Sequence, residues 1–188
     1  MKVKICFVGD FRVGKTSLIR KFVLDEFDDR YLETIGAKVT KKSVIVDHPS
    51  KDRGYCVDML IWDIMGRKGF GDLLREAYFY GARGIVAVCD LTRPETVEGL
   101  RDWIDSVVRV TGDVPIYVLA NKADLEQNVD EETIAHFAES YDSPYLLTSA
   151  KTGMNVERAF ADMALRTSTL DLSGPEAKER ERVSVQAD

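Results

Sequence analysis

The feature that most constrains this chain is a glycine-rich loop close to its beginning. Residues Gly9 to Thr16 read G-D-F-R-V-G-K-T and follow directly on the apolar run Lys4 to Val8. The next segment, Ser17 to Val23, carries apolar residues at the spacing of one helix face. Strand, loop and helix therefore follow in the order that a phosphate-binding loop requires. In such a loop the backbone N–H groups surround a chain of phosphates, Lys15 places its ammonium between the last two, and the Thr16 hydroxyl binds Mg²⁺.

Apolar runs and amphipathic segments alternate along most of the remaining chain. Strands are expected at 44–46, 57–62, 85–89, 115–120 and 145–147, and helical patterns lie at about 68–80, 95–110, 131–140 and 155–167. The polar segment Asp47 to Gly54 separates the first two of these runs and indicates a hairpin. The pattern predicts an α/β fold: a doubly wound, mostly parallel six-stranded sheet with one antiparallel edge strand and flanking helices. Ligands of such sheets bind beyond the carboxyl ends of the strands.

Length, charge and cysteine content set further limits. A chain of 188 residues is long enough for one domain with its own core, which we expect at 1–170, followed by a charged, flexible tail at 171–188. The net charge of −6 argues against nucleic-acid binding. No run approaches the roughly 18 apolar residues of a membrane span. The three cysteines have no zinc-ligand spacing, so we expect reduced thiols, most of them buried, and a cytoplasmic location.

Two further motifs follow expected strands. N-K-A-D at 121–124 comes after the run 115–120, and T-S-A-K at 148–151 comes after the run 145–147. A carboxylate at Asp124 can accept hydrogen bonds from the N1–H and the exocyclic amine of guanine, a donor pair that adenine does not present on that edge. Taken alone, N-K-x-D also fits a polar turn at the end of a strand. Beside the phosphate-binding loop and T-S-A-K, the guanine interpretation is favoured.

Together with Y-L-E-T-I-G at 31–36 and W-D-I-M-G at 62–66, these motifs resemble those of Ras-superfamily small GTPases, most of all the Rab branch. The resemblance covers about residues 1–167. It implies a switch that binds GTP or GDP with Mg²⁺ and hydrolyses GTP. It also implies effector, exchange-factor and GTPase-activating proteins that contact switch segments near 27–40 and 63–80.

The resemblance assigns roles around the base. Asn121 supports the base and its loop, the stem of Lys122 packs over the ring, the Ala150 N–H reaches the base's carbonyl oxygen, and Phe27 contacts the base edge-on. The full set of expected nucleotide-binding residues is Gly9, Asp10, Phe11, Arg12, Val13, Gly14, Lys15, Thr16, Ser17, Phe27, Tyr31, Thr34, Gly66, Asn121, Lys122, Asp124, Ser149, Ala150 and Lys151.

The resemblance also assigns roles around the phosphates. Thr34 and Asp63 join Thr16 as the expected ligands of Mg²⁺, directly or through water. The backbone N–H groups of Thr34 and Gly66 sense the third phosphate. The expected catalytic residues are Lys15, Thr34, Gly66 and Arg67.

The chain departs from the family pattern where hydrolysis takes place. Residues 63–68 read D-I-M-G-R-K, whereas the family pattern D-T-A-G-Q-E has a glutamine where Arg67 stands. That glutamine orients the attacking water, and an arginine has no acceptor for it. Phe11 occupies a loop position where the family mostly has a small residue. Both changes predict a low intrinsic rate of hydrolysis.

Two hypotheses for Arg67 are open. In the first, its guanidinium stabilises transition-state charge from within the chain. In the second, it is a solvated residue or partner contact, and an activating protein supplies the catalytic groups.

Two other functions stay open as alternatives. One is a GTP-bound interaction module that does not hydrolyse, which Arg67 and Phe11 favour. The other is a phosphate-loop kinase or ATPase, which leaves N-K-A-D and T-S-A-K unexplained. The last residues, Val185 to Asp188, contain no cysteine for prenylation, so we expect no lipid anchor.

Overall fold

A computed structural model describes residues 1–28, 34–47, 54–66 and 72–173. Tyr31 and Arg67, which are among the predicted site residues, lie outside these residues. Within the described part of the chain, no helix combines the length and the apolar character needed to cross a membrane. The elements in chain order are β1 Lys2–Val8, α1 Lys15–Leu24, β2 Ala37–Val46, β3 Tyr55–Ile64, α2 Asp72–Phe79, β4 Gly84–Asp90, α3 Glu95–Glu98, α4 Leu100–Thr111, β5 Ile116–Asn121, α5 Glu131–Glu139, β6 Tyr145–Leu147 and α6 Val156–Ser173.

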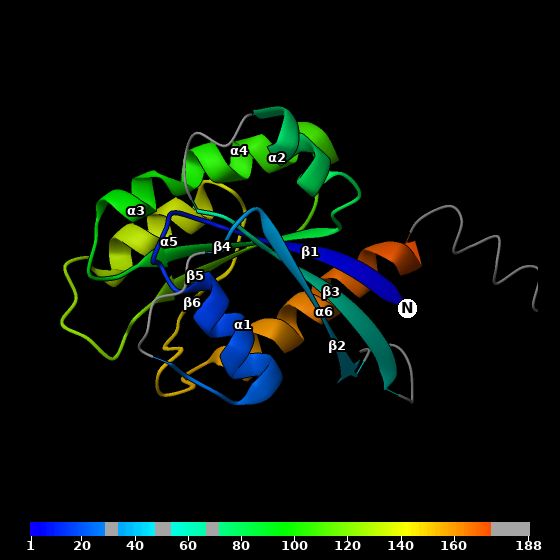
Figure 1. Cartoon of the computed structure of the whole chain (residues 1–188), viewed down its shortest axis with the longest axis horizontal. Coiled ribbons are helices and arrows are strands. Elements are labelled where there is room, and N and C mark those ends of the chain that lie inside the picture. Colours follow the sequence, from blue (N-terminus) through cyan, green and yellow to red (C-terminus); the bar gives the residue numbers. More distant parts are fainter. Residues whose placement is uncertain (29–33, 48–53, 67–71, 174–188) are drawn as a thin grey trace, which may run out of the picture.

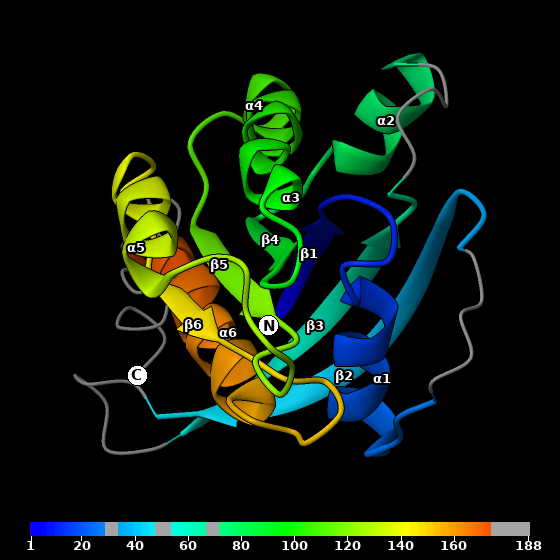
Figure 2. The same ribbon diagram turned by 90° about the vertical axis from the view of Figure 1, so that its left-hand side faces the viewer.

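The strands form one six-stranded sheet in the order β2-β3-β1-β4-β5-β6. The edge strand β2 is antiparallel to β3, and the other neighbours are parallel. Helices cover both faces: α1 and α6 lie on one side, and α2, α3, α4 and α5 lie on the other (Figures 1 and 2). The predicted fold class is therefore confirmed.

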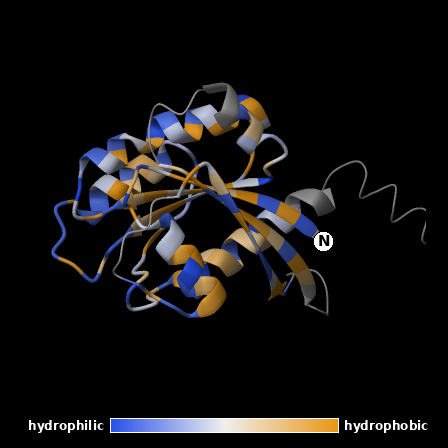
Figure 3. Ribbon diagram, viewed as in Figure 1, coloured by the Kyte–Doolittle hydropathy of each residue, from blue (hydrophilic) through white to orange (hydrophobic). Residues whose placement is uncertain are grey.

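Two apolar clusters hold these layers together, one on each face of the sheet. On the α1 and α6 face, the rings of Phe22 and Phe160 stack with centroids 3.9 Å apart, and Phe7 of β1 packs against Phe160 at 5.2 Å. On the other face, Trp103 of α4 and Phe79 of α2 are buried. Figure 3 shows apolar residues along the central strands, and each fully buried side chain of this size contributes about 1.5–3 kcal/mol. This core fixes the carboxyl ends of the parallel strands, where the polar motifs begin.

Three element boundaries differ from the sequence prediction. Strand β2 begins at Ala37 rather than at residue 44, because it pairs with β3 from Ala37 opposite Ile64 to Val46 opposite Tyr55. The predicted helix at 95–110 is two helices, α3 and α4, which meet at Gly99. Helix α6 continues to Ser173 and so enters the segment expected to be a tail.

Candidate functional site

A cavity of about 840 Å³ opens where the loops after β1 and β5 come together. The predicted site residues that line it are Phe11, Arg12, Gly14, Lys15, Thr16, Ser17, Phe27, Thr34, Gly66, Asn121, Lys122, Asp124, Ala150 and Lys151. Lining residues that were not predicted as site residues are Arg20, Leu24, Glu26, Asp28, Ile35, Lys38, Ile64, Met65 and Leu125. The structure thus brings motifs from both halves of the chain around one hollow.

Other predicted residues lie behind this lining. The side chain of Asp10 accepts a 2.9 Å hydrogen bond from the indole Nε1 of Trp103, so it is engaged with α4. The Ser149 hydroxyl donates to Oδ1 of Asp124 at 2.6 Å and so supports a carboxylate that does line the cavity. Gly9 and Val13 contribute backbone to the loop.

The ammonium of Lys15 lies inside the phosphate-binding loop. Its Nζ donates to the carbonyl oxygens of Gly9 at 2.6 Å and Asp10 at 2.9 Å. Burial lowers the pKa of Lys15 to about 8, although the nearby carboxylates of Asp63 and Asp10 act in the opposite direction. Gly66 packs close to this loop, because a Cβ there would lie 2.5 Å from the backbone nitrogen of Phe11.

Two hydroxyls and one carboxylate meet beside Lys15. The hydroxyl of Thr16 donates to Oδ2 of Asp63 at 2.5 Å, and that of Thr34 donates to the same oxygen at 3.3 Å. The two hydroxyl oxygens are 3.1 Å apart. Burial raises the pKa of Asp63, and its Oδ1 is buried with no hydrogen-bond partner among the described residues.

An unpartnered buried carboxylate oxygen beside two hydroxyls is a donor set that fits Mg²⁺, which prefers hard oxygen ligands and keeps some of its ligands as water or phosphate. The described residues contain no group of three or more His, Cys, Asp or Glu suited to a metal. The site therefore depends on hydroxyl oxygens as well as on a carboxylate.

The loop after β5 is tied to the phosphate-binding loop by Asn121. Its Nδ2 donates to the carbonyl oxygen of Val13 at 2.9 Å, and its Oδ1 accepts from the Ala150 N–H at 3.2 Å and the Thr148 hydroxyl at 3.4 Å. The resemblance predicted that the Ala150 N–H donates to the carbonyl oxygen of the base. In this structure it donates to Oδ1 of Asn121.

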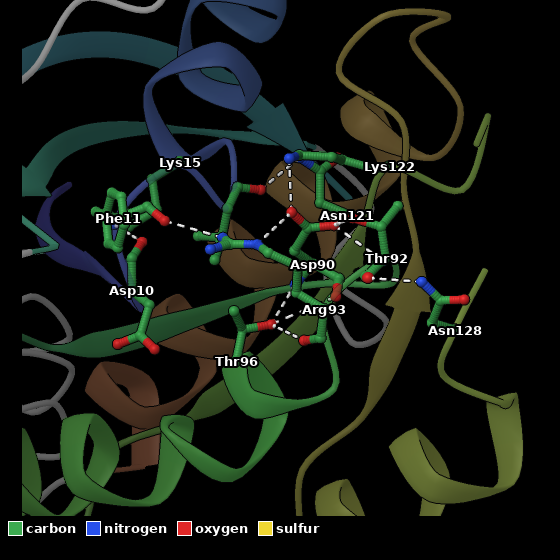
Figure 4. A network of polar contacts seen from close by, with 11 residues as sticks. Asp10, Phe11, Lys15, Asp90, Thr92, Arg93, Thr96, Asn121, Lys122 and Asn128 are labelled. Carbon is green, nitrogen blue, oxygen red and sulfur yellow. Dashed lines mark hydrogen bonds and ion pairs between the residues drawn. The ribbon is translucent and has the colours of Figure 1, made fainter. Parts of the chain in front are cut away.

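A buried carboxylate that the sequence analysis did not single out completes the site. Asp90, at the end of β4, is fully buried, and its Oδ2 accepts from Nζ of Lys122 at 2.6 Å and Nε of Arg93 at 3.0 Å (Figure 4). Its Oδ1 accepts from the backbone N–H and the hydroxyl of Thr92. Burial acts to raise the pKa of Asp90, but the hydrogen bonds from Lys122 and Thr92 outweigh it, so the pKa lies below its usual value. Asp90 follows directly on the apolar run 85–89, and this position at the carboxyl end of an expected strand could have identified it as a candidate site residue.

Comparison with known proteins identifies the fold's relatives. The model of the Ras family matches residues 4–169. The chain belongs to the Ras family. This match runs from β1 into α6, so it includes every residue that lines the cavity.

Two relatives from Zea mays agree with this assignment. The chain is 32% identical to the GTP-binding protein YPTM1 over 185 residues, which cover 97% of this chain and 86% of that protein. It is 33% identical to the GTP-binding protein YPTM2 over 186 residues, which cover 97% and 88%. The predicted resemblance to Rab-like small GTPases of the Ras superfamily is confirmed, and the kinase or ATPase alternative is set aside.

Proposed function

We propose that this small GTPase is a guanine-nucleotide switch that binds GTP and GDP with Mg²⁺ and hydrolyses GTP slowly. One observation carries the proposal: a single cavity is lined both by the phosphate-binding loop with Lys15 and by Asp124, the carboxylate proposed to select guanine. The relatives YPTM1 and YPTM2, which are named as GTP-binding proteins, support it.

Selection of guanine rests on Asp124 and its support. The carboxylate is exposed to the cavity, and the Ser149 hydroxyl fixes one of its oxygens at 2.6 Å. A fixed carboxylate accepts two hydrogen bonds from guanine, while adenine would leave it without these donors. Lys122 is held by its ion pair with Asp90, which supports a role for its stem in packing over the base.

Binding of the phosphates rests on Lys15 and the oxygen cluster around Asp63. Among the described residues, the Lys15 ammonium donates to two carbonyl oxygens of its own loop, and phosphate oxygens would complete its hydrogen bonding. Thr16, Thr34 and Asp63 would hold Mg²⁺, which neutralises charge on the phosphate oxygens when it is bound. Because Thr34 shares an oxygen of Asp63 with Thr16, the segment around Thr34 is drawn toward the metal site.

The switch segments are proposed at 27–40 and 63–80, where effector, exchange-factor and GTPase-activating proteins would bind. The two segments already touch, since the N–H of Met65 donates to the carbonyl oxygen of Gly36 at 2.9 Å. Contacts of the Thr34 and Gly66 N–H groups with a third phosphate would order both segments, and hydrolysis would release them.

Slow hydrolysis is proposed because Arg67 replaces the residue that orients the attacking water, while Phe11 stands at the cavity. Single-turnover hydrolysis of GTP-loaded protein tests this. Arg67→Gln is expected to be at least ~10-fold faster than the wild type, since it restores an acceptor for water. Arg109→Gln, on the exposed face of α4, is the matched control and is expected to leave the rate unchanged.

Arg67→Ala separates the two hypotheses for Arg67. A lower rate than the wild type supports charge stabilisation by Arg67, and an unchanged rate supports a solvated residue. Rapid hydrolysis by the wild type alone would contradict the proposal, and no phosphate release at all would leave a non-hydrolysing GTP-bound module.

A further inference from the structure

Arg93 makes a forked contact with two segments that are distant in the sequence. Its Nε donates to Oδ2 of Asp90 at 3.0 Å, and its Nη2 donates to the carbonyl oxygen of Phe11 at 2.9 Å (Figure 4). Phe11 belongs to the phosphate-binding loop and lies 82 residues earlier in the chain. One guanidinium therefore joins the end of β4 to the loop after β1.

The side chain of Phe11 is held by the same arginine. The guanidinium carbon of Arg93 lies 5.7 Å from the centroid of the Phe11 ring, and that of Arg12 lies 5.9 Å from it. These distances are within the range of cation–π attraction. Phe11 is 44% exposed, so a mobile ring would be expected without such contacts. Arg93 thus restrains both the backbone and the ring of this loop residue.

Asp90 connects this restraint to the base-binding loop. The same Oδ2 that accepts from Arg93 also accepts from Lys122, at 2.6 Å. The carboxylate is fully buried, and Thr92 occupies its other oxygen through two hydrogen bonds. Charge-assisted hydrogen bonds are stronger when they are shielded from water, as the Asp90 carboxylate is. The contacts that run from Lys122 through Asp90 and Arg93 to the more exposed Phe11 carbonyl therefore connect the two loops.

We propose that Arg93 is a positioning residue that ties the phosphate-binding loop to the base-binding loop through Asp90 and thereby slows release of the guanine nucleotide. This inference rests on the proposed function, because both loops are placed against the nucleotide by it. Release requires the two loops to move away from the ligand, and the link opposes their separation.

The chemistry of the link requires arginine. A guanidinium offers several N–H donors in a rigid plane and can serve a carboxylate and a carbonyl in different directions at once. A lysine at this position would keep the positive charge but would present it as a single point. If charge close to the phosphates were the whole contribution, lysine would replace arginine without loss.

Release of a fluorescent GDP analogue, followed after mixing with excess unlabelled GDP, tests the proposal. Arg93→Ala is expected to release the analogue at least ~10-fold faster than the wild type, while the association rate stays within about twofold. Arg93→Lys is expected to be clearly faster than the wild type as well. Arg109→Ala removes an arginine from the exposed face of α4 and is expected to match the wild type.

A double-mutant cycle with Asp90→Asn tests whether Arg93 acts through Asp90. The amide preserves the shape of the side chain but removes the charge that both Arg93 and Lys122 contact. If the two residues act together, the double variant releases GDP no faster than the faster single variant. Independent, multiplicative effects would overturn the link through Asp90. If Asp90→Asn fails to fold, the comparison of alanine with lysine at position 93 decides alone.

The outcomes separate this inference from the proposed function. If the wild type binds no GDP analogue, both the proposed function and the role of Arg93 are overturned. If the wild type binds and Arg93→Ala releases the analogue at the wild-type rate, only the role of Arg93 is overturned. Wild-type release by Arg93→Lys would show that charge suffices and would likewise overturn the bridging role.

Discussion

The side-chain amide of Asn121 donates a 2.9 Å hydrogen bond to the carbonyl oxygen of Val13, which lies 108 residues earlier in the chain. Gly14 makes room for this contact, because a Cβ there would collide with the amide nitrogen of Asn121. Gly14 also has φ 100°, a value that other residues rarely adopt. Gly14 of the phosphate-binding loop and Asn121 of the N-K-A-D motif therefore form one contact between the two loops.

Asn121→Ala is expected to weaken both the fold and nucleotide binding. Asn121 is 1% exposed, and its loss leaves the Val13 carbonyl and the Ala150 N–H without their partner. Each unsatisfied buried group costs about 1–3 kcal/mol, so we expect a loss of roughly 2–4 kcal/mol in the free energy of unfolding. Urea unfolding measures it. Asn128→Ala is the control: its amide also donates a hydrogen bond, to the Thr92 carbonyl at 2.9 Å, but the contact is exposed, so the expected cost is less than about 1 kcal/mol.

Asp124→Asn is expected to exchange guanine for xanthine as the preferred base. Asparagine still accepts a hydrogen bond from N1–H, but its NH₂ faces the guanine amine, whereas it can donate to the 2-oxo group of xanthine. A site with unpaired polar groups rejects a ligand by about 10⁴-fold or more, so GDP affinity should fall steeply. Competition between GDP and xanthosine diphosphate measures the change. Asp142→Asn, on an exposed turn, should leave the preference unaltered, and retained guanine preference in Asp124→Asn would contradict the assigned role.

Removal of Mg²⁺ is expected to speed release of GDP from the wild type. The buried Oδ1 of Asp63 has no protein partner in the described part of the chain, so the metal site loses its charge balance without the ion. Asp63→Asn should therefore release GDP quickly with or without chelator. A wild type that is insensitive to chelator would contradict a metal at Thr16 and Asp63.

Nucleotide affinity is expected to fall as the pH rises above about 8. Burial lowers the pKa of Lys15 from 10.5 to about 8, and phosphates bind the charged ammonium. The fall should approach tenfold per pH unit, measured as the dissociation constant of GDP between pH 7 and pH 9 at constant ionic strength.

The nucleotide-free protein should show the opposite trend. Between about pH 8 and 10.5 the folded chain has released the Lys15 proton that the unfolded chain still holds. Stability rises with pH wherever the unfolded state binds more protons, so the contribution of Lys15 to the free energy of unfolding rises with pH over this range.

GDP affinity that is flat from pH 7 to 9 would contradict the buried Lys15 ammonium on which both pH predictions rest.

Thiol chemistry checks the fold independently of any ligand. Burial raises the pKa of Cys6 and of Cys89 to about 12, while Cys56 is exposed. One of the three thiols should react rapidly with a disulfide reagent at pH 8, and the other two only after denaturation. Cys56→Ser should abolish the rapid phase. Rapid reaction of two or more thiols in the native protein would contradict the packing of β1 and β4.

Much of this arrangement was accessible from the sequence, because its motifs follow apolar runs. The run Lys4 to Val8 and the loop Gly9 to Thr16 predicted β1 and the phosphate-binding loop, and the motif at 121–124 predicted where β5 ends. Parallel strands place such loops at one edge of the sheet, so their meeting around one cavity follows from the topology. The roles of these residues toward a nucleotide stay predictions.

Other features depend on tertiary contacts that the sequence pattern does not display. The first half of β2 was missed because residues 38–43 are mostly polar and include three lysines, and their strand conformation comes from pairing with β3. The link through Asp90 and Arg93 was missed because these two residues belong to no motif and their partners Phe11 and Lys122 are distant in the sequence. Arg67 lies outside the described residues, so its role depends on experiment.

The most direct test of the central claim is to denature the purified protein, with no nucleotide added, and identify what it releases by ion-exchange chromatography. The account predicts a guanine nucleotide at close to one per chain. Mostly GDP would indicate turnover during expression, and mostly GTP would indicate that hydrolysis is nearly silent. Release of an adenine nucleotide would contradict a guanine-nucleotide switch. So would failure of the refolded protein to bind GDP or GTP with Mg²⁺.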